Sequence, residues 1–531
     1  MSAFLTFDHL SVAAPDGRRL FSDLTISVGR ELVGIVGRNG SGKSTLLSVA
    51  SGEREPSSGT INRSSHIAML RQIQPDDSSI AEALGVASDL DRLRRLEIGE
   101  GSAEDAGLAD WTLEQRIEDV FDRVKLPSIN TQRSVASLSG GERTRLGLVA
   151  MLLTNPNLLL MDEPTNNLDV QGREAIADLL DAWPGGALIA SHDRDLLERV
   201  DRIVHLSQVG IFSVTGGWSA FIAERDALRE RLETELASAE HDLKQQRIAV
   251  QRQVEKKARR DKAGRARRAK GIDSKLFLNA QAERAEHSAA RDSHLADRLI
   301  GDVRNAVDEA RRQVEIVTPL TIDLPQPDLP ANRTLLKFDE VSFECDGKML
   351  FGPLSFSLTG PMRVVVSGPN GSGKTSLLRL AMGLSEPSSG HVKRINNALA
   401  MLDQHVELLD PRLDLVANMQ ARHAKMTRGQ AHEVLARFAF RNQDALRSVS
   451  TLSGGERLRA GLAMITGGPS TPQMLVLDEP TNHLDVESIE MLEQSLSSYK
   501  GALMLVSHDR KFLDNIGYDD EIHIAGYCEN E

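Results

Sequence analysis

The chain has 531 residues, of which 40% are hydrophobic and 26% are charged, and its formal net charge is −13. This composition is typical of a soluble multidomain protein and excludes an integral membrane protein, because no apolar run approaches the roughly 20 residues that cross a bilayer. Residues 1–10 lack the basic and apolar regions of a secretory signal, and Cys345 and Cys528 are too few for a disulfide framework. We therefore expect a cytoplasmic protein without a membrane domain.

A glycine-rich loop follows the first predicted buried strand, and the same arrangement occurs again in the second half of the chain. Residues 33–36 (VGIV) lead into GRNGSGKS at 37–44, and residues 363–366 (RVVV) lead into GPNGSGKT at 368–375. Strand, glycine loop and helix in this order indicate a phosphate-binding loop, in which backbone N–H groups converge on a phosphate, the lysine adds a positive charge and the next hydroxyl can bind Mg²⁺. The residues predicted to bind ATP in this way are Gly37, Asn39, Gly40, Ser41, Gly42, Lys43, Ser44, Thr45, Gly368, Asn370, Gly371, Ser372, Gly373, Lys374, Thr375 and Ser376.

The two halves differ in length between the next two motifs. Gln72 (in MLRQ) is equivalent to Gln404 (in MLDQ), and the string LSGGE occurs at 138–142 and 452–456, so the first half contains 18 additional residues between these motifs. The additional residues fall in a charged stretch near 85–115. A short helical arm and a longer exposed loop are both compatible with this stretch, since loop insertions cost little free energy.

An apolar strand that ends in two acids follows LSGGE in each half. The strings LLLMDE and MLVLDE end at Glu163 and Glu479. A parallel strand buried on both faces is expected here, with both acids at its carboxyl end. We predict that Asp162 and Asp478 bind Mg²⁺ and that the glutamates polarise the water attacking the γ-phosphate, because phosphoryl transfer depends on positioning and charge.

A histidine ends the next apolar strand in each half. His192 and His508 lie in Ser-His-Asp triplets directly after apolar residues. We predict that each histidine hydrogen-bonds the γ-phosphate. A serine hydrolase triad is excluded, because three consecutive residues cannot converge on one reacting atom.

The segment between the halves is predicted to be a basic helical hairpin that ends in a stiff, proline-containing tether at 319–330. Apolar residues recur at helical spacing over 218–257 and 279–317, which predicts two antiparallel arms of about 40 residues, each about 60 Å long. The stretch 244–275 contains 13 Lys or Arg residues and 3 acidic residues, and Gly264 and Gly271 are expected to bracket the tip of the hairpin. The residues predicted to bind an RNA backbone are Lys256, Lys257, Arg259, Arg260, Lys262, Arg265, Arg267, Arg268 and Lys270.

Together these motifs resemble those of ATP-binding cassette proteins. The glycine-rich loop, the glutamine, LSGGE, the Asp-Glu pair and the histidine occur in each half in the order that this family has. More narrowly, EPTNNLD at 163–169, EPTNHLD at 479–485 and SHDRKFLD at 507–514 are similar to the ABC-F subfamily, whose members carry two cassettes and no membrane domain. The resemblance implies an ATPase that uses ATP and Mg²⁺.

The resemblance also implies an architecture and a pairing of sites. The expected fold class is α/β, with two P-loop cassettes in tandem at 1–217 and 331–531, joined by a long antiparallel α-helical hairpin at 218–330. In this family the cassettes close head to tail, so that LSGGE of one half touches the ATP held by the other, and pairing within one chain predicts a monomer. The LSGGE residues expected to contact ATP are Ser139, Gly140, Gly141, Ser453, Gly454 and Gly455, and the resemblance adds Gln72 and Gln404 as catalytic residues and Mg²⁺ ligands.

Folded RNA is the predicted partner of the hairpin. Aromatic residues are nearly absent from the basic stretch, Phe277 being the exception, which disfavours stacking on single strands. The resemblance implies insertion of the hairpin into the tRNA exit site of the ribosome, contacts with rRNA and the P-site tRNA, and a role in regulating translation or in protecting ribosomes from an antibiotic. The alternatives are an ATPase subunit of an ABC transporter and a DNA-associated ABC ATPase.

Overall fold

The computed structural model describes most of the chain, which forms two compact units. One unit comprises Met1–Phe221 and Leu320–Glu531, and the other comprises Ile222–Pro319. Both glycine-rich loops lie in the first of these units. The described residues are 3–14, 17–71, 73, 77–166, 168–207, 211–269, 304, 307, 309, 322–345, 347–395, 398–482 and 484–525.

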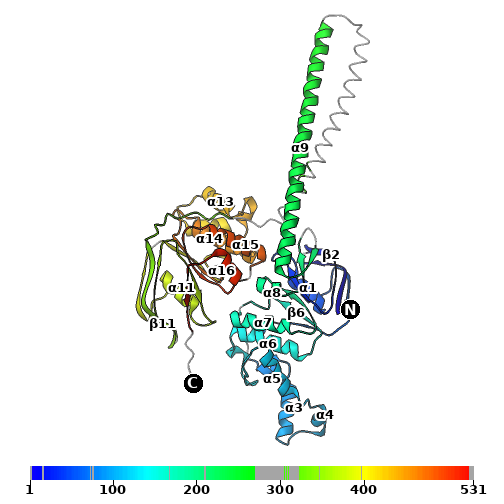
Figure 1. The fold of residues 1–531 in the computed structure, drawn as a ribbon, viewed down its shortest axis with the longest axis vertical. Helices are drawn as coiled ribbons and strands as arrows, with labels where there is room; N and C mark the ends of the chain where they lie inside the picture. Colours follow the sequence, from blue (N-terminus) through cyan, green and yellow to red (C-terminus); the bar gives the residue numbers. More distant parts are fainter. Residues whose placement is uncertain are drawn as a thin grey trace. The chain divides into compact units, whose positions relative to one another are not determined.

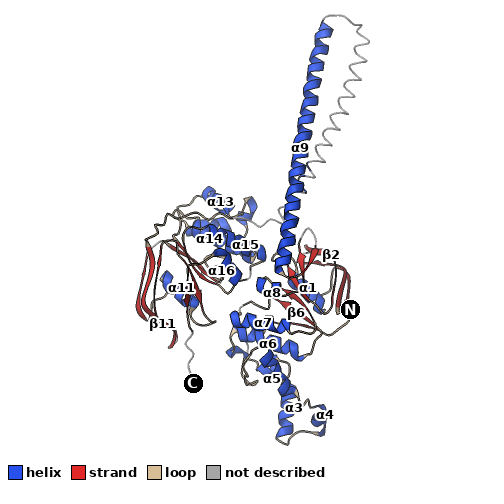
Figure 2. Ribbon diagram, in the orientation of Figure 1, coloured by secondary structure: helices blue, strands red, loops and turns tan. Residues whose placement is uncertain are grey.

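The first half combines a small antiparallel sheet with a larger, mainly parallel sheet, and Figure 2 shows the helices packed beside the strands. The small sheet has the order β2-β1-β4, and the larger sheet has the order β5-β6-β7-β3-β8-β9, in which the β8–β9 pair is antiparallel. The strands are β1 (Leu5–Ala13), β2 (Arg19–Val28), β3 (Leu32–Val36), β4 (Ser58–Arg63), β5 (Ile67–Met69), β6 (Leu158–Asp162), β7 (Gly186–Ala190), β8 (Arg202–Leu206) and β9 (Ile211–Thr215). The helices are α1 (Lys43–Ser51), α2 (Ile80–Ala83), α3 (Ala87–Glu97), α4 (Ala103–Leu108), α5 (Leu113–Arg123), α6 (Gly140–Leu153), α7 (Val170–Asp181) and α8 (Arg194–Glu198), together with the 3-10 turn η1 (Val135–Ser137).

Strand β6 illustrates why the central strands are apolar at every position. Leu158 and Leu160 pack in the core that includes the antiparallel sheet and α1, whereas Leu159 and Met161 pack in the core that includes α6 and α7. Successive side chains of a strand point to opposite faces, so a strand covered on both faces needs an apolar residue at each position. The first charged side chain of β6 therefore comes at its carboxyl end, at Asp162.

The additional residues of the first half form helices. Helices α3 and α4 occupy the charged stretch, and Figure 1 shows them beyond α5, away from the parallel sheet of this half. Leu93 packs into the core of the half, whereas Ile98, Leu108 and Trp111 are each more than 60% exposed. Of the two interpretations that the sequence left open, a helical arm describes this stretch better than a loop.

The second half repeats the arrangement of the first. Its small sheet has the order β11-β10-β13, and its larger sheet, in the order β14-β15-β16-β12-β17, is parallel and reproduces the order β5-β6-β7-β3-β8. The predicted α/β fold with tandem repeats is therefore confirmed. The strands are β10 (Thr334–Cys345), β11 (Lys348–Thr359), β12 (Arg363–Ser367), β13 (Ser389–Arg394), β14 (Leu399–Leu402), β15 (Met474–Asp478), β16 (Ala502–Val506) and β17 (Asp520–His523). The helices are α11 (Lys374–Met382), α12 (Leu415–Arg422), α13 (Arg428–Arg437), α14 (Gly454–Thr466), α15 (Val486–Ser498) and α16 (Arg510–Ile516), with 3-10 turns η2 (Asn442–Leu446) and η3 (Val449–Thr451).

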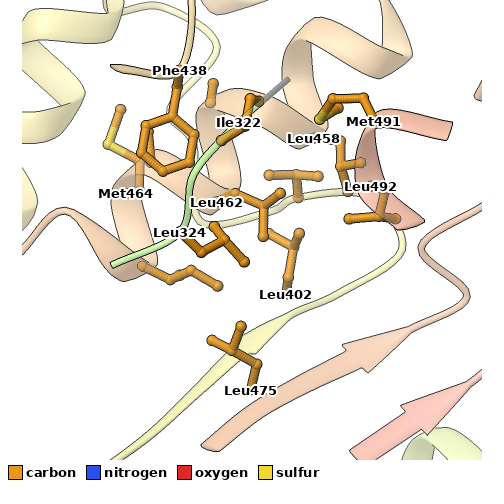
Figure 3. Packing of buried hydrophobic residues seen from close by; sticks show 14 of the residues in the cluster. Ile322, Leu324, Leu402, Phe438, Leu458, Leu462, Met464, Leu475, Met491 and Leu492 are labelled. Atoms are coloured by element: carbon orange, nitrogen blue, oxygen red, sulfur yellow. The ribbon is translucent and has the colours of Figure 1, made fainter. Parts of the chain in front are cut away.

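The segment that leads into the second half is part of its core. Ile322 and Leu324 are 1% and 2% exposed and belong to the hydrophobic cluster of Phe438 and Met464 (Figure 3). The Ile322 carbonyl accepts a hydrogen bond from Ser495 Oγ at 2.9 Å. The proline-containing stretch was expected to be a tether, but its described residues pack against the second half, because the alternating apolar residues before Pro325 bury one face of the segment.

The helix that follows the first half is longer than the sequence predicted. Helix α9 (Trp218–Ala269) has 52 residues, or about 78 Å at 1.5 Å per residue, and it continues through Gly264. Glycine in a helix costs about 1 kcal/mol, but the surrounding Lys, Arg and Ala residues are strong helix formers, so the basic stretch stays helical at least to Ala269. The predicted second arm and the last residues of the tip, including Lys270, lie outside the described residues except for positions 304, 307 and 309.

Replacement of Ile322 by Ala tests the structural role of the segment before β10. We expect Ile322→Ala to lower the free energy of unfolding by about 2–4 kcal/mol, since it leaves a cavity in a well-packed core. Chemical denaturation of the whole protein, followed by far-UV circular dichroism, measures this decrease. The neighbouring Asp323 is exposed, so Asp323→Ala should change stability by less than about 0.5 kcal/mol. Equal stability of the two variants would show that the segment is a tether after all.

Candidate functional site

Each glycine-rich loop ends in a glycine that no other residue can replace without strain. Gly42 and Gly373 cap α1 and α11 in the left-handed conformation, with φ of 104° and 96°. A Cβ atom at Gly42 would lie 3.0 Å from the ring of Phe21, and one at Gly373 would lie 2.9 Å from the ring of Phe351. The loop backbone therefore turns tightly over an aromatic ring at the start of the helix, where an anion is favoured.

A buried lysine begins the helix after each loop. Lys43 Nζ donates a hydrogen bond to the carbonyl of Gly37 at 2.7 Å, and Lys374 Nζ donates one to the carbonyl of Gly368 at 2.8 Å. Burial lowers the pKa of both lysines, while nearby carboxylates act in the opposite direction. Each ammonium group is thus held inside its loop at a helix N-terminus, which is the arrangement expected of a phosphate site.

A serine hydroxyl in each loop is also placed where it could bind a polyphosphate. Ser41 Oγ and Ser372 Oγ are buried and have no hydrogen-bond partner among the residues that the structure describes. Leaving a buried hydroxyl unpaired costs about 1–3 kcal/mol, and a phosphate oxygen in the loop would satisfy it. Left-handed glycine, buried lysine and unpaired hydroxyl occur at equivalent positions in both halves, so both loops fit ATP.

The two glutamates predicted to be catalytic have an unusual backbone conformation. Glu163 and Glu479 follow β6 and β15 with φ of 46° and 44°, in the left-handed region that glutamate seldom adopts. The neighbouring strand fixes this geometry, because Glu163 N donates to the Ala190 carbonyl at 2.8 Å and Glu479 N donates to the Val506 carbonyl at 2.9 Å. Strain of this kind costs about 1–3 kcal/mol and is typical of active sites.

Each of these glutamates contacts the histidine predicted to act beside it. His192 Nε2 lies 3.2 Å from Glu163 Oε1, and His508 Nε2 lies 3.3 Å from Glu479 Oε1. Burial raises the pKa of Glu479 to about 7 and lowers the pKa of His508 to about 4, and the pKa values of Glu163 and His192 shift in the same directions for the same reason. The imidazoles are therefore neutral at physiological pH, and the contacts are not ion pairs.

The predicted Mg²⁺ ligands form only part of a coordination shell. The hydroxyl of Thr375 hydrogen-bonds Asp478, a carboxyl group whose pKa is raised by burial. Among the described residues, no cluster of three or more His, Cys, Asp or Glu side chains could hold a metal ion by itself. An ion held by Thr375 and Asp478, or by Ser44 and Asp162, would thus take its other oxygen ligands from phosphates and water, as Mg²⁺ commonly does.

The LSGGE motif starts a helix in each half through a capping box. Ser139 N donates to Glu142 Oε2 at 2.7 Å while Ser139 Oγ accepts from Glu142 N at 3.3 Å, and Ser453 and Glu456 form the same pair of bonds. The glutamate of LSGGE is therefore structural, and the serine and glycines lie at the positive end of α6 or α14. Contact between these N-termini and ATP of the opposite half stays a prediction.

The structure reveals contacts between the halves that sequence analysis missed, and one of them involves a cap of α15. Asp485 caps α15 by accepting a hydrogen bond from Ser488 N, and its other oxygen, Oδ2, accepts one from Asn39 N at 2.9 Å. The glycine-rich loop of the first half is thus bonded to a helix of the second. In the sequence, Asp485 belongs to the Leu-Asp pair that follows EPTNN or EPTNH in each half. This pattern indicated that the segment matters but not which residue it contacts.

Nearly all the predicted ATP, catalytic and metal residues lie among the described residues. Gln404 is half-buried in the turn after β14, whereas Gln72 lies outside the described residues. Of the predicted RNA-binding residues, Lys256, Arg259 and Lys262 are exposed on α9. The side chains of the others lie outside the described part.

Comparisons with known proteins identify the family. The model of the ABC transporter family matches residues 22–166 and 351–482. The ATP-binding protein Uup of Escherichia coli is 32% identical over 520 residues, which cover 91% of this chain and 74% of Uup. The ATP-binding cassette sub-family F member 3 of Mus musculus is 30% identical over 93% of this chain and 67% of its own length. This chain belongs to the ABC-F subfamily. Like the other members, it is an ATPase with two tandem cassettes.

Two further comparisons concern another relative and a solved structure. The energy-dependent translational throttle protein EttA of Mycobacterium tuberculosis is 30% identical over 91% of this chain and 84% of EttA. The crystal structure of the complex of archaeal ribosomal stalk protein aP1 and archaeal ribosome recycling factor aABCE1 contains a chain that aligns with a TM-score of 0.53 at 17% identity, covering 97% of this chain and 87% of that one. This second likeness concerns the fold alone. Within the described ranges, no helix combines the length and hydropathy that a membrane span requires.

Alanine at the capping glycines tests the assignment of the two loops. We expect Gly42→Ala/Gly373→Ala to weaken ATP binding about tenfold or more, because a left-handed alanine costs about 1–2 kcal/mol and its Cβ meets Phe21 or Phe351. Isothermal titration with ATP and Mg²⁺ measures the change. A Cβ atom added to Gly429 on α13 would have no heavy atom within 4 Å. Gly429→Ala therefore serves as the control and should bind ATP normally. Normal binding by the double variant would contradict the assignment.

Proposed function

We propose that this ABC-F ATPase binds the ribosome while ATP holds its cassettes together, and that it dissociates after hydrolysis, thereby regulating translation. The observation that carries the proposal is the similarity to EttA, a translational throttle protein by name, over 91% of this chain. The cassettes predicted at 1–217 and 331–531 make up about four-fifths of the sequence, so the similarity extends into the segment between them. That segment is where a ribosome-binding member of the family differs from a transporter ATPase.

The charge of the segment between the cassettes supports an RNA partner. The stretch 244–275 carries 13 basic and 3 acidic residues in a chain of net charge −13. Arg252, Lys256 and Arg259 are exposed on α9, and their spacing of four and three residues places them along one face. A stripe of cations on a long helix can follow a phosphate backbone without exposing the acidic cassettes to it. We propose rRNA and the P-site tRNA as its contacts.

The two ATP sites supply the conformational change in this proposal. Bound Mg²⁺ would neutralise charge on the β- and γ-phosphate oxygens. Lys43 and Lys374 hold the phosphates, and Glu163 and Glu479, fixed at the ends of their strands, orient and polarise the attacking water. The LSGGE helix of the opposite cassette adds its positive N-terminus. Hydrolysis removes the group that both cassettes contact, and the cassettes separate.

The double variant Glu163→Gln/Glu479→Gln tests the coupling of hydrolysis to release. An amide cannot accept a proton from the attacking water, so turnover should fall by about 10²–10⁴-fold while ATP binding persists. We expect the variant to sediment with ribosomes in sucrose gradients when ATP is present and to inhibit translation in a cell-free system. Lys43→Ala/Lys374→Ala, which lacks the phosphate-binding cations, is the control and should sediment free. A glutamine variant that also sediments free would refute the proposal.

Removal of positive charge from the linker tests the RNA contact. Arg265→Gln/Arg267→Gln/Arg268→Gln should weaken ribosome binding and flatten its salt dependence by about one unit of slope for each phosphate that is no longer neutralised. The matched control is Arg422→Gln/Lys425→Gln/Arg428→Gln, which removes the same charge from exposed residues of the second cassette. Binding to ribosomes and to duplex DNA at matched salt should separate an RNA-directed protein from a DNA-directed one. Equal effects of the two triple variants would rule out a specific role of the linker.

A further inference from the structure

The phosphate loop of the Lys43 site is bonded to the opposite cassette. Arg38 follows Gly37 in the first loop, and its guanidinium forms an ion pair with Glu487 in the first turn of α15. The next loop residue, Asn39, donates its N–H to Asp485 at the cap of the same helix. Two successive residues of the first loop are therefore bonded to one helix end in the second cassette.

A buried ion pair extends this contact further along α15. Arg194 lies two residues after His192, and its Nη1 lies 2.6 Å from Glu493 Oε1, with the two side chains only 5% and 11% exposed. Glu493 is eight residues beyond Asp485, or about two helical turns. The first cassette thus contacts α15 at two places. Its phosphate loop contacts the start of α15, and Arg194, at the start of α8, contacts the middle of α15.

The sequence prevents the same ion pair at the loop of the second site. Alignment of the two cassettes places Pro369 at the position of Arg38 and Gln171 at the position of Glu487. Neither residue carries a charge. This difference is built into the chain and holds in any conformation of the cassettes.

The buried ion pair of Arg194 has only a weak counterpart at the second site. Ala177 takes the place of Glu493, and Arg510, the counterpart of Arg194, lies 3.8 Å from Glu174 with both side chains more than half exposed. A cavity of about 560 Å³ lies beside Pro369, and residues of α7 and of the second phosphate loop line it together. Exposed ion pairs contribute little, whereas desolvated ones are costly to break, so the two interfaces differ in strength.

We infer that the two sites of this ATPase are not equivalent, and that Arg38 and Arg194 are positioning residues that keep the Lys43 site closed against α15. Nucleotide held between a phosphate loop and the opposite cassette can leave only when the two part. Contacts that exist only in the closed state favour that state. Nucleotide therefore leaves the Lys43 site more slowly than the Lys374 site. The inference rests on the ATPase activity of the family and not on ribosome binding.

Release of a fluorescent nucleotide from the isolated protein tests this inference. The full-length Glu163→Gln/Glu479→Gln protein is loaded with mant-ATP and Mg²⁺ in the absence of ribosomes and mixed rapidly with excess ATP. We expect two release phases of similar amplitude. Lys43→Ala should abolish the slow phase, and Lys374→Ala should abolish the fast one. A single phase, or the opposite assignment of the phases, would overturn the inference.

Substitutions of the ion pairs then test the cause of the difference. Arg38→Ala should speed the slow phase by about two- to fivefold, the size expected for an ion pair whose arginine side chain is 53% exposed, and leave the fast phase unchanged. The charge-reversed pair Arg38→Glu/Glu487→Arg should restore slow release, and Pro369→Arg/Gln171→Glu should slow the fast phase. Arg437→Ala removes an exposed ion pair within one cassette and is the matched control.

These substitutions test the effect of the ion pairs on nucleotide release independently of the proposed binding to ribosomes. A slow phase that Arg38→Ala leaves unchanged, or an equal change of both phases, would show that the ion pair does not set the difference. Arg194→Lys gives a second test in which the cation is kept but the geometry changes, and it should also speed the slow phase. Ribosome sedimentation of the same proteins is measured separately, so either idea can fail alone.

Discussion

Burial of the central strands on both faces is the constraint on which both sites depend. Strands β6 and β15 have no room for a charged side chain until they reach their carboxyl ends, where the Asp-Glu pairs emerge beside the phosphate loops. The same burial removes water from the glutamates and the histidines, which raises the pKa of the acids and lowers that of the imidazoles. The positions of the groups predicted to be catalytic and their shifted pKa values thus share one cause, the burial of the central strands.

Much of the fold could be predicted because its signals are local. The strand, loop and helix around Lys43 lie within about 20 consecutive residues, and the apolar run before Asp162 is continuous, so short patterns sufficed to place them. The capping role of Glu142 was also present in the Ser-x-x-Glu spacing. The family resemblance assigns a role to the serine and glycines of this motif but none to its glutamate.

The features that were missed depend on contacts distant in sequence or on competing local preferences. Asn39 and Asp485 are 446 positions apart, and no local pattern pairs them. Ile322 was assigned to a tether because prolines surround it, although its burial depends on a core formed by later residues. Gly264 suggested a turn, but one glycine does not outweigh a run of strong helix formers.

The left-handed backbone of Glu163 and Glu479 also bears on how the protein balances durability against activity. Glycine at either position would relieve the local strain, so each cassette is less stable than the same fold would be without its predicted catalytic glutamate. Natural selection for stability alone would remove these two side chains. Their presence at the end of both central strands means that the fold tolerates the same conformational penalty twice in one chain, once for each ATP site.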